Sequence, residues 1–301
     1  MATSSRILFI INPNAGKRKT KRLIQQLDFL KDNVIYRLTE YPKHSIEIIQ
    51  KELNRFDVFV AVGGDGTVNE VASALVNTDK KLAVYPAGSG NGFAREFGFT
   101  KNLKHLMQAI EIGETRKTDV NRINGLLSIH ITGVGYDAAV AHDFTKLKGR
   151  GFWNYLISTV RVIFDYHSVQ ASIQLEKGTI AGRFFIIDIA NSAQYGYGAK
   201  MAPMADPTDG QFDLVLVKPL YWLEFPYFAF KLFTGQLKNS RKIQYIPCQS
   251  PVTIVTSEKN FHIDGEAVQL ISPLQIEVQR GVLNVINTGK VKKAISSLLF
   301  L

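Results

Sequence analysis

A carboxylate flanked by glycines is the first feature of this sequence that suggests chemistry. Asp65 lies in the segment GGDGT (63–67), directly after the apolar run at 57–62. Glycines after a buried strand let the backbone approach a phosphate, and the next helix N-terminus supplies free N–H groups. A carboxylate there repels phosphate, so it makes sense facing a metal–triphosphate complex or an acceptor hydroxyl. The structural alternative is an Asx turn or a helix cap; we favour the functional interpretation.

Two further glycine-rich turns also follow predicted strands. They are NPNAGK (12–17) and PAGSGNGFAR (86–95). In an open parallel sheet, ligands bind beyond the carboxyl ends of the strands, so three such turns indicate a phosphate-rich ligand. Neither standard nucleotide loop is present: Lys17 is followed by Arg18 instead of Ser or Thr, and the first turn lacks the dinucleotide fingerprint.

The elements that must position these turns form two groups. In the first third, strand-like and helix-like segments alternate, as in a parallel sheet covered on both faces. Strands are predicted at 6–12, 33–39, 57–62 and 81–87, and helices at 21–31, 44–56, 68–76 and 103–113. After about residue 115 the pattern becomes that of a β-sandwich, beginning with a hairpin around Asn124-Gly125. Further strands are predicted at 168–176, 181–191, 211–219, 250–256 and 272–279, with helical inserts near 152–166 and 220–237.

The predicted fold is therefore α/β plus all-β, in two domains. The first covers residues 1–120 and is rejoined by a C-terminal amphipathic helix at 288–301, and the second covers 121–287. The length of 301 residues agrees with two domains. The single cysteine, Cys248, excludes an internal disulfide and a cysteine-based metal site.

Composition narrows the class of protein. The net charge of +10 attracts polyanions, whether nucleotides, nucleic acid or anionic lipid. No basic stripe with interleaved stacking aromatics is present, which argues against nucleic-acid binding. No run of about 18 apolar residues occurs. We expect a soluble, cytoplasmic protein.

The glycine-rich turns resemble those of the diacylglycerol kinase catalytic family, which includes bacterial lipid kinases and sphingosine kinases. The resemblance extends through GVGYDA (133–138), NSAQYGYGAKMAPMADPTDGQFDLVLV (191–217) and HIDGEAV (262–268). It implies a nucleotide-binding α/β domain, a β-sandwich domain and an active site in the cleft between them.

The resemblance also implies roles for individual residues. Asp65 matches the family's active-site aspartate, and Glu266 matches a glutamate essential in bacterial members; which of the two is the base stays open. Asp209 matches a carboxylate that holds a structural magnesium ion in some relatives. Matches to positions around ATP are Asn12, Gly63, Gly64, Gly66, Thr67, Gly88, Ser89, Gly90 and Asn91.

Two features leave the acceptor open. Gly92 replaces an aspartate that bacterial diacylglycerol kinases usually carry, and PAGSGN (86–91) is similar to the sphingosine kinase version. Asp137 falls where those enzymes bind the amino-alcohol head of the lipid, although a helix cap is equally compatible. Arg150 is either a group that neutralises the moving phosphate or an ordinary surface arginine.

We therefore predict a lipid kinase that uses ATP and Mg²⁺ to phosphorylate a membrane lipid hydroxyl, on diacylglycerol or a sphingoid base. The alternatives are an NAD kinase-like enzyme and a non-catalytic lipid- or nucleotide-binding relative. The aromatic segments 151–166 and 219–238 suit peripheral contact with the inner face of a membrane, or they cover the sandwich core. Whether the chain forms a homodimer is left open.

Overall fold

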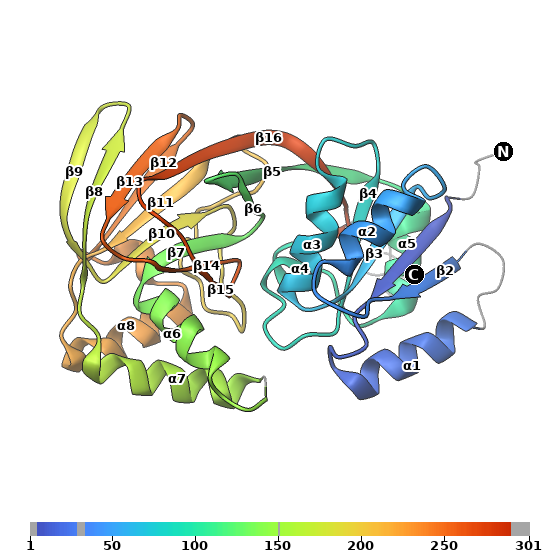
Figure 1. The fold of residues 1–301 in the computed structure, drawn as a ribbon, viewed down its shortest axis with the longest axis horizontal. Coiled ribbons are helices and arrows are strands. Elements are labelled where there is room, and N and C mark those ends of the chain that lie inside the picture. The colour runs from blue at the N-terminus through green and yellow to red at the C-terminus, as the bar shows by residue number, and fades with distance from the viewer. Residues whose placement is uncertain (1–4, 29–33, 150, 290–301) are drawn as a thin grey trace, which may run out of the picture. The chain divides into compact units, whose positions relative to one another are not determined.

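The computed structural model describes residues 5–28, 34–149 and 151–289. Arg150, and the predicted C-terminal helix from residue 290 onward, lie outside the described residues. The chain divides into two compact units (Figure 1). One unit runs to Thr118 and resumes at Gly281, and the other spans Asp119–Arg280.

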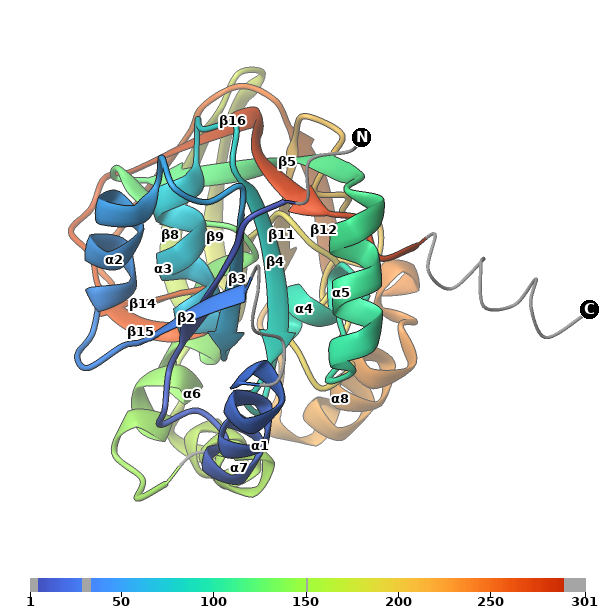
Figure 2. The same ribbon diagram turned by 90° about the vertical axis from the view of Figure 1, so that its right-hand side faces the viewer.

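The N-terminal unit is built on a parallel sheet of strand order β2-β1-β3-β4. Its first elements are β1 (Ile7–Ile11), α1 (Lys17–Asp28), β2 (Val34–Leu38), α2 (His44–Glu52), β3 (Val58–Gly63), α3 (Asp65–Leu75), β4 (Lys81–Pro86), α4 (Gly92–Glu96) and α5 (Leu103–Ile112). Every residue of β1 and β3 is buried, as expected for apolar strands covered on both faces. Figure 2 shows α2 and α3 on one side of the sheet and α5 on the other. The predicted parallel α/β fold is confirmed.

Two helices begin earlier than predicted. α1 begins at Lys17 and α3 at Asp65. The basic and glycine-rich residues at these positions carry no apolar periodicity, so the sequence pattern could not mark the helix starts.

The C-terminal unit contains two antiparallel sheets. Six strands pair in the order β12-β11-β10-β7-β14-β15, and the second sheet continues from β16 through β13, β8 and β9, with β5 and β6 attached. The strands are β5 (Thr115–Ile123), β6 (Leu126–Ser128), β7 (Ile131–Gly135), β8 (Val169–Leu175), β9 (Gly178–Phe184), β10 (Ile186–Ala190), β11 (Phe212–Val217), β12 (Ile243–Cys248), β13 (Val252–Thr256), β14 (Asn260–Ile263), β15 (Glu266–Gln269) and β16 (Leu274–Ile286). Buried apolar residues of both sheets form one core, so the predicted sandwich is confirmed.

The chain passes between the two units along β5 and β16. The last residues of β16 pair in parallel with β4, with Asn284 opposite Lys81. β16 therefore contributes residues to both units, and the second unit ends at Arg280.

Two of the predicted strand segments each form two separate strands in the structure. The run at 181–191 is two strands, β9 and β10, which belong to different sheets. The run after the Asn124-Gly125 turn likewise divides into β6 and β7. Strands β12, β14 and β15 and helix α6 (Tyr136–Thr145) were not predicted. The alternation of apolar and polar residues does not show where the chain leaves one sheet for another, because the apolar side chains are buried in both sheets.

Helices cover the outer face of the six-stranded sheet. They are α6, α7 (Phe152–Asp165), the short 3₁₀ turns η1 (Trp222–Glu224) and η2 (Leu237–Asn239), and α8 (Phe225–Thr234). Tyr136, Phe185 and Phe228 belong to the second apolar cluster, which lies beneath them. Within the described residues, no helix is both long and apolar enough to cross a bilayer.

Candidate active site

Three loops of the N-terminal unit meet at the carboxyl ends of β1, β3 and β4. The N–H of Asn12 donates to the carbonyl of Val62 at 3.0 Å. The carbonyl of Gly63 accepts N–H groups from Ala87 at 2.9 Å and Gly88 at 3.0 Å. The structure therefore brings the three glycine-rich segments onto one edge of the sheet.

Glycine is required where these loops touch. A Cβ placed on Gly88 would lie 2.5 Å from the Cα of Gly64, and one on Gly16 would lie 2.4 Å from the carbonyl oxygen of Ala87. Gly16 also has a φ of +59°, a region that disfavours other residues. The obstructing atoms are backbone, so a side chain would force the loops apart.

Asp65 is the first residue of α3, and Gly64 is the N-cap residue. The helix-cap alternative for Asp65 is therefore wrong. Its Oδ1 accepts the N–H of Phe93 in α4 at 3.3 Å, so the carboxylate connects the loop after β3 with the loop after β4. A negative group in the first turn also suits the positive end of α3.

Two asparagines order the neighbouring backbone. Asn12 donates from Nδ2 to Thr67 Oγ1 at 3.3 Å and accepts the N–H of Asn14 at 3.0 Å. Asn91 donates from Nδ2 to the carbonyl of Gly88 at 2.8 Å. The Oδ1 of Asn91 is buried without a hydrogen-bond partner in the described part of the chain, and a ligand donor would satisfy it. The predicted ATP positions that lie at this edge are Asn12, Gly63, Gly64, Gly66, Thr67, Gly88, Ser89, Gly90 and Asn91.

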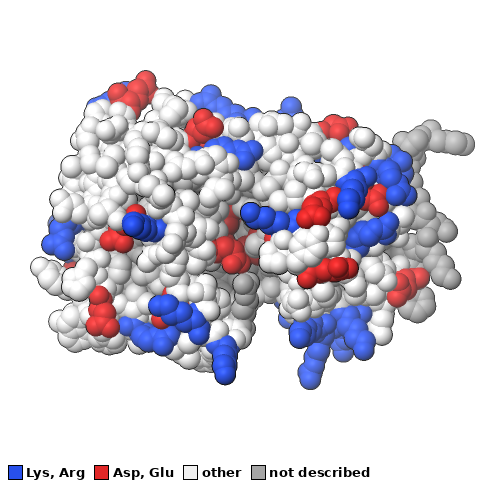
Figure 3. Space-filling view, in the orientation of Figure 1, with Lys and Arg blue, Asp and Glu red and all other residues white. Residues whose placement is uncertain are grey.

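Positive charge lies beside the loops. Lys17, Arg18 and Lys19 open α1 and are exposed, and Figure 3 shows basic side chains gathered over this segment. The adjacent ammonium group of Lys19 lowers the pKa of Lys101, and partial burial and the charge of Arg95 lower it further. Arg95 donates from Nε to the carbonyl of Gly90 at 3.2 Å. These cations favour a polyanion at this edge.

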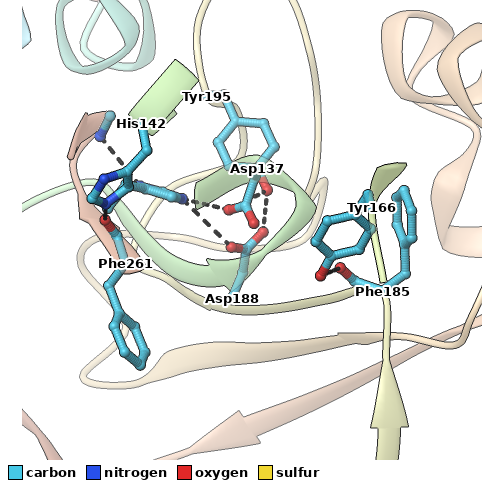
Figure 4. A network of polar contacts seen from close by, with 9 residues as sticks. Asp137, His142, Tyr166, Phe185, Asp188, Tyr195 and Phe261 are labelled. Carbon is cyan, nitrogen blue, oxygen red and sulfur yellow. Dashed lines mark hydrogen bonds and ion pairs between the residues drawn. The ribbon is translucent and has the colours of Figure 1, made fainter. Parts of the chain in front are cut away.

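In the C-terminal unit, Asp137 belongs to a buried polar cluster. Its Oδ2 accepts a short hydrogen bond from His262 Nε2. Tyr195 donates a short hydrogen bond to Asp188 Oδ2 and contacts Asp137 Oδ2 at 3.4 Å. Figure 4 shows Asp137, Asp188 and Tyr195 pointing toward one another. Asp137 is 8% exposed, and Asp188 is completely buried.

A glycine makes room for this cluster. Gly133 of β7 is opposite Asp188 of β10 on one side and His262 of β14 on the other. A Cβ on Gly133 would lie 2.0 Å from Asp188 Oδ1 and 2.7 Å from Asp137 Oδ2. The side chains of Asp137, Asp188 and His262 therefore occupy the space that a side chain at position 133 would fill.

The tautomer of His262 decides what the cluster can bind. Asp137, Asp188 and His262 place ligand-type atoms within 4.8 Å of one another, which by itself would suit a metal ion. However, the N–H of Gly265 donates to His262 Nδ1 at 3.3 Å, so in a neutral ring the proton is on Nε2. A metal-bound nitrogen needs its lone pair. The arrangement favours a hydrogen-bonded network over a metal centre.

Asp188, Tyr195 and His262 were not predicted from the sequence as site residues. A signal was present, since Asp188 interrupts the apolar run FFIIDIA (184–190). A carboxylate inside a buried strand needs a partner. His262 and Tyr195 lie within motifs that the resemblance includes, but no spacing rule connects residues on β10, β14 and the loop after β10.

Burial raises the pKa of Asp188 well above its ordinary value, and the charge of Asp137 raises it further. The folded chain then holds a proton at Asp188 that the unfolded chain releases above a pH of about 4. Because the folded chain keeps this proton on Asp188, the free energy of unfolding decreases as the pH rises from about 4 toward the raised pKa of Asp188.

We accordingly expect Asp188→Asn to gain stability relative to the parent chain as pH rises from 5 to 8, because an amide needs no proton. Urea denaturation at several pH values measures this. Asp165→Asn, at the exposed end of α7, is the control and leaves the pH dependence unchanged. If the stability difference between Asp188→Asn and the parent chain stayed constant across this range, Asp188 would not hold the proton described above.

The other predicted residues are placed differently. Glu266 is exposed and begins β15, directly after a turn in which Asp264 has a φ of +51°. The buried carboxylate of Asp264 accepts from Ser128 Oγ at 2.8 Å and from the N–H groups of Ile129 and His130 at 3.0 and 2.9 Å. This anchor fixes the turn that carries Glu266.

Asp209 is exposed in the turn before β11. Its two carboxylate oxygens accept the N–H of Gln211 at 3.1 Å and the side-chain amide of the same residue at 2.8 Å. Burial and the charge of Asp209 raise the pKa of Asp213 in β11, and the assignment of Asp209 to a structural magnesium site stays a prediction.

Two family models of known proteins match the two parts of the chain. Residues 6–123 match the family model for the diacylglycerol kinase catalytic domain, and residues 130–287 match that for the YegS C-terminal NAD kinase β-sandwich-like domain. A diacylglycerol kinase of Bacillus subtilis (strain 168) is 26% identical over 87% of this chain and 89% of its own length. One from Staphylococcus epidermidis is 25% identical, covering 87% and 85%.

Solved structures give the same fold. A diacylglycerol kinase crystal structure from Bacillus anthracis superposes with a TM-score of 0.73 at 20% identity, covering 97% of this chain and all of the other. Another structure from that organism gives 0.78 at 23% identity with the same coverage. At these identities the likeness concerns the fold alone.

Proposed function

Because the chain belongs to the family that joins a diacylglycerol kinase catalytic domain to a YegS-type β-sandwich domain, we propose that it transfers the γ-phosphate of ATP to a membrane lipid hydroxyl. The chain is a diacylglycerol kinase-like phosphotransferase. The observation that carries the proposal is the meeting of three glycine loops around Asp65 at one sheet edge. The acceptor lipid and the residue roles are the proposed part.

The N-terminal unit supplies the nucleotide site in this proposal. Free N–H groups of the loops and the N-terminus of α3 receive phosphate oxygens. Lys19, Arg95 and Lys101 add positive charge beside them. The Oδ1 of Asn91, which has no hydrogen-bond partner among the described residues, accepts a donor group of the nucleotide. A Mg²⁺ ion bound together with ATP would supply neutralisation of the phosphate charge.

Asp65 acts on the acceptor in this proposal. Phosphoryl transfer to an alcohol has a loose transition state, so orientation of the hydroxyl matters more than early proton removal. The half-buried carboxylate of Asp65, held by the Phe93 N–H, orients the lipid hydroxyl and receives its proton late. Glu266, on the turn anchored by Asp264, is the second candidate base. Asp209 is proposed as a ligand of a structural magnesium ion and not as a catalytic group.

A neutral hydroxyl acceptor such as diacylglycerol is favoured over a sphingoid base. An amine head group would need the carboxylate of Asp137, which is engaged by His262 and almost fully buried. The sphingoid base remains the second candidate, because Asp137 Oδ1 and Asp188 Oδ1 are buried without hydrogen-bond partners in the described part of the chain. An ammonium group entering the cluster would satisfy both.

A lipid screen tests the function. Labelled ATP is offered with mixed micelles of diacylglycerol, monoacylglycerol, sphingoid base, ceramide, phosphatidylglycerol or undecaprenol, and with NAD in solution. We expect label in diacylglycerol and none in NAD. Label in NAD would favour the soluble-acceptor alternative, and nucleotide binding without transfer to any acceptor would favour a non-catalytic relative. Transfer to the sphingoid base that Asp137→Asn abolishes would make the amine lipid the substrate.

A further inference from the structure

The helices α7 and α8 are apolar on two opposite sides. Their inner sides pack against the apolar cluster on the outer face of the six-stranded sheet, through Val162 and Ile163 of α7 and Phe228 of α8. Because both cover the same sheet face, their outer sides belong to one surface of this unit (Figure 1).

The outer side of α7 carries exposed apolar residues at one helical spacing. Trp153, Ile157, Val160 and Phe164 follow at intervals of four, three and four residues, which places them in a single stripe. Trp153 is 73% exposed and Phe164 is 70% exposed. Exposing such an apolar stripe to water raises the free energy of the folded chain unless another apolar surface covers the stripe.

The segment from Tyr221 to Thr234 repeats this feature. Its exposed large apolar side chains are Tyr221, Trp222, Leu223, Tyr227, Phe230 and Phe233. Together with the stripe on α7 we call these residues the aromatic face. Its Trp and Tyr members have an apolar body and a polar tip, which suits the boundary between water and acyl chains.

Charge and length indicate what covers the aromatic face. The segments 152–165 and 221–234 contain two acidic residues, Asp165 at the end of α7 and Glu224 at the end of η1, and Glu224 is paired with Lys242 at 3.1 Å. The Nζ of Lys231 lies 4.5 Å from the centre of the Tyr227 ring, and the whole chain has a charge of +10. α7 has 14 residues, about 21 Å at 1.5 Å per residue, short of the roughly 30 Å hydrocarbon core.

We infer that the aromatic face lies in the headgroup region of an anionic bilayer, with α7 and α8 in the plane of the membrane. This inference rests on the proposed function, because a lipid acceptor lies in a bilayer. Trp153 and Trp222 enter the interface, and Lys231 meets anionic headgroups.

Tryptophan fluorescence measures this binding without an added label, because both tryptophans of the chain, Trp153 and Trp222, are on the aromatic face. The full-length protein is titrated with vesicles of phosphatidylcholine containing 30% or no phosphatidylglycerol. We expect a blue-shifted tryptophan emission, protection from acrylamide, and quenching by lipids brominated near the top of the acyl chain. Unchanged emission and quenching with the anionic vesicles would overturn the inference.

Variants separate docking from catalysis. We expect Phe164→Ala combined with Phe230→Ala to weaken binding to anionic vesicles at least tenfold, while turnover of a short-chain, water-soluble diacylglycerol stays within twofold. Ile271→Ala is the control, because Ile271 is 81% exposed outside the aromatic face, and it should bind vesicles normally.

The remaining outcomes are also decisive. Vesicle binding without phosphorylation of any lipid would overturn the proposed function and support the docking surface. Equal loss of binding in the Ile271→Ala variant would overturn the assignment to the aromatic face. A concentration-dependent dimer that buries both tryptophans in the absence of lipid would overturn the bilayer as its occupant.

Discussion

Replacing Asp65 with asparagine is expected to lower lipid phosphorylation at least about 100-fold while the chain stays folded. The amide oxygen of asparagine can still accept the N–H of Phe93, so the link between the loops survives. What is lost is the negative charge that, in the proposed function, orients the acceptor hydroxyl and receives its proton. Initial rates with saturating ATP and micellar diacylglycerol measure the effect, and ATP affinity by calorimetry should change less than about threefold.

Asp79→Asn is the matched control for this variant. Asp79 is an exposed acid of the same unit whose side chain is 86% accessible, and its replacement removes the same charge without touching the loops. We expect parental rates from it. If Asp65→Asn turned over within a few-fold of the parent, Glu266 would become the better candidate for the base, and Glu266→Gln would then be the variant that loses activity.

The second large effect is expected for Gly133→Ala, which should destabilise the chain by about 2–3 kcal/mol. The added methyl group would lie 2.0 Å from Asp188 Oδ1 and 2.7 Å from Asp137 Oδ2. Both carboxylates are buried and hydrogen-bonded, so neither can move without losing a partner. Thermal unfolding measures the change, with a fall in Tm of roughly 5–10 °C for a unit of this size.

Two comparisons keep this prediction specific. Gly182→Ala introduces the same methyl group in β9, where the nearest atom is 3.6 Å away, and it should change the stability by less than about 0.5 kcal/mol. Asp188→Ala removes the atom that the new methyl group meets, so Gly133→Ala should cost less in that background. Equal destabilisation by Gly133→Ala and Gly182→Ala would show that the buried cluster does not depend on the glycine.

The parallel sheet and its loops could be predicted because each depends on residues close together in sequence. Apolar runs such as DVFVAV (57–62) are long enough to identify buried strands, and each glycine-rich turn follows its own strand directly. Parallel strands align their carboxyl ends, so the meeting of the three loops follows from local pattern plus one general rule. The role assigned to Asp65 still awaits its variant.

The helix-cap interpretation of Asp65 failed for a physical reason. Capping depends on where the helix begins, and the glycine-rich segment shows no apolar periodicity from which the start of α3 could be read. The structure begins the helix one residue earlier than a capping role for Asp65 requires, which makes Gly64 the cap. The carboxylate of Asp65 accepts the N–H of Phe93, 28 residues away.

Taken alone, the sequence determined that this chain is a two-domain α/β and β-sandwich protein of the diacylglycerol kinase family, with glycine loops suited to phosphate. Only the tertiary structure decided that Asp137 is engaged by His262 beside Asp188, and that Asp264 anchors the Glu266 turn. Those contacts join residues 51 to 136 positions apart, across strands whose pairing partners no local pattern specifies. Register between distant strands is set by how the whole sheet packs, and the chemistry of the C-terminal unit depends on that register.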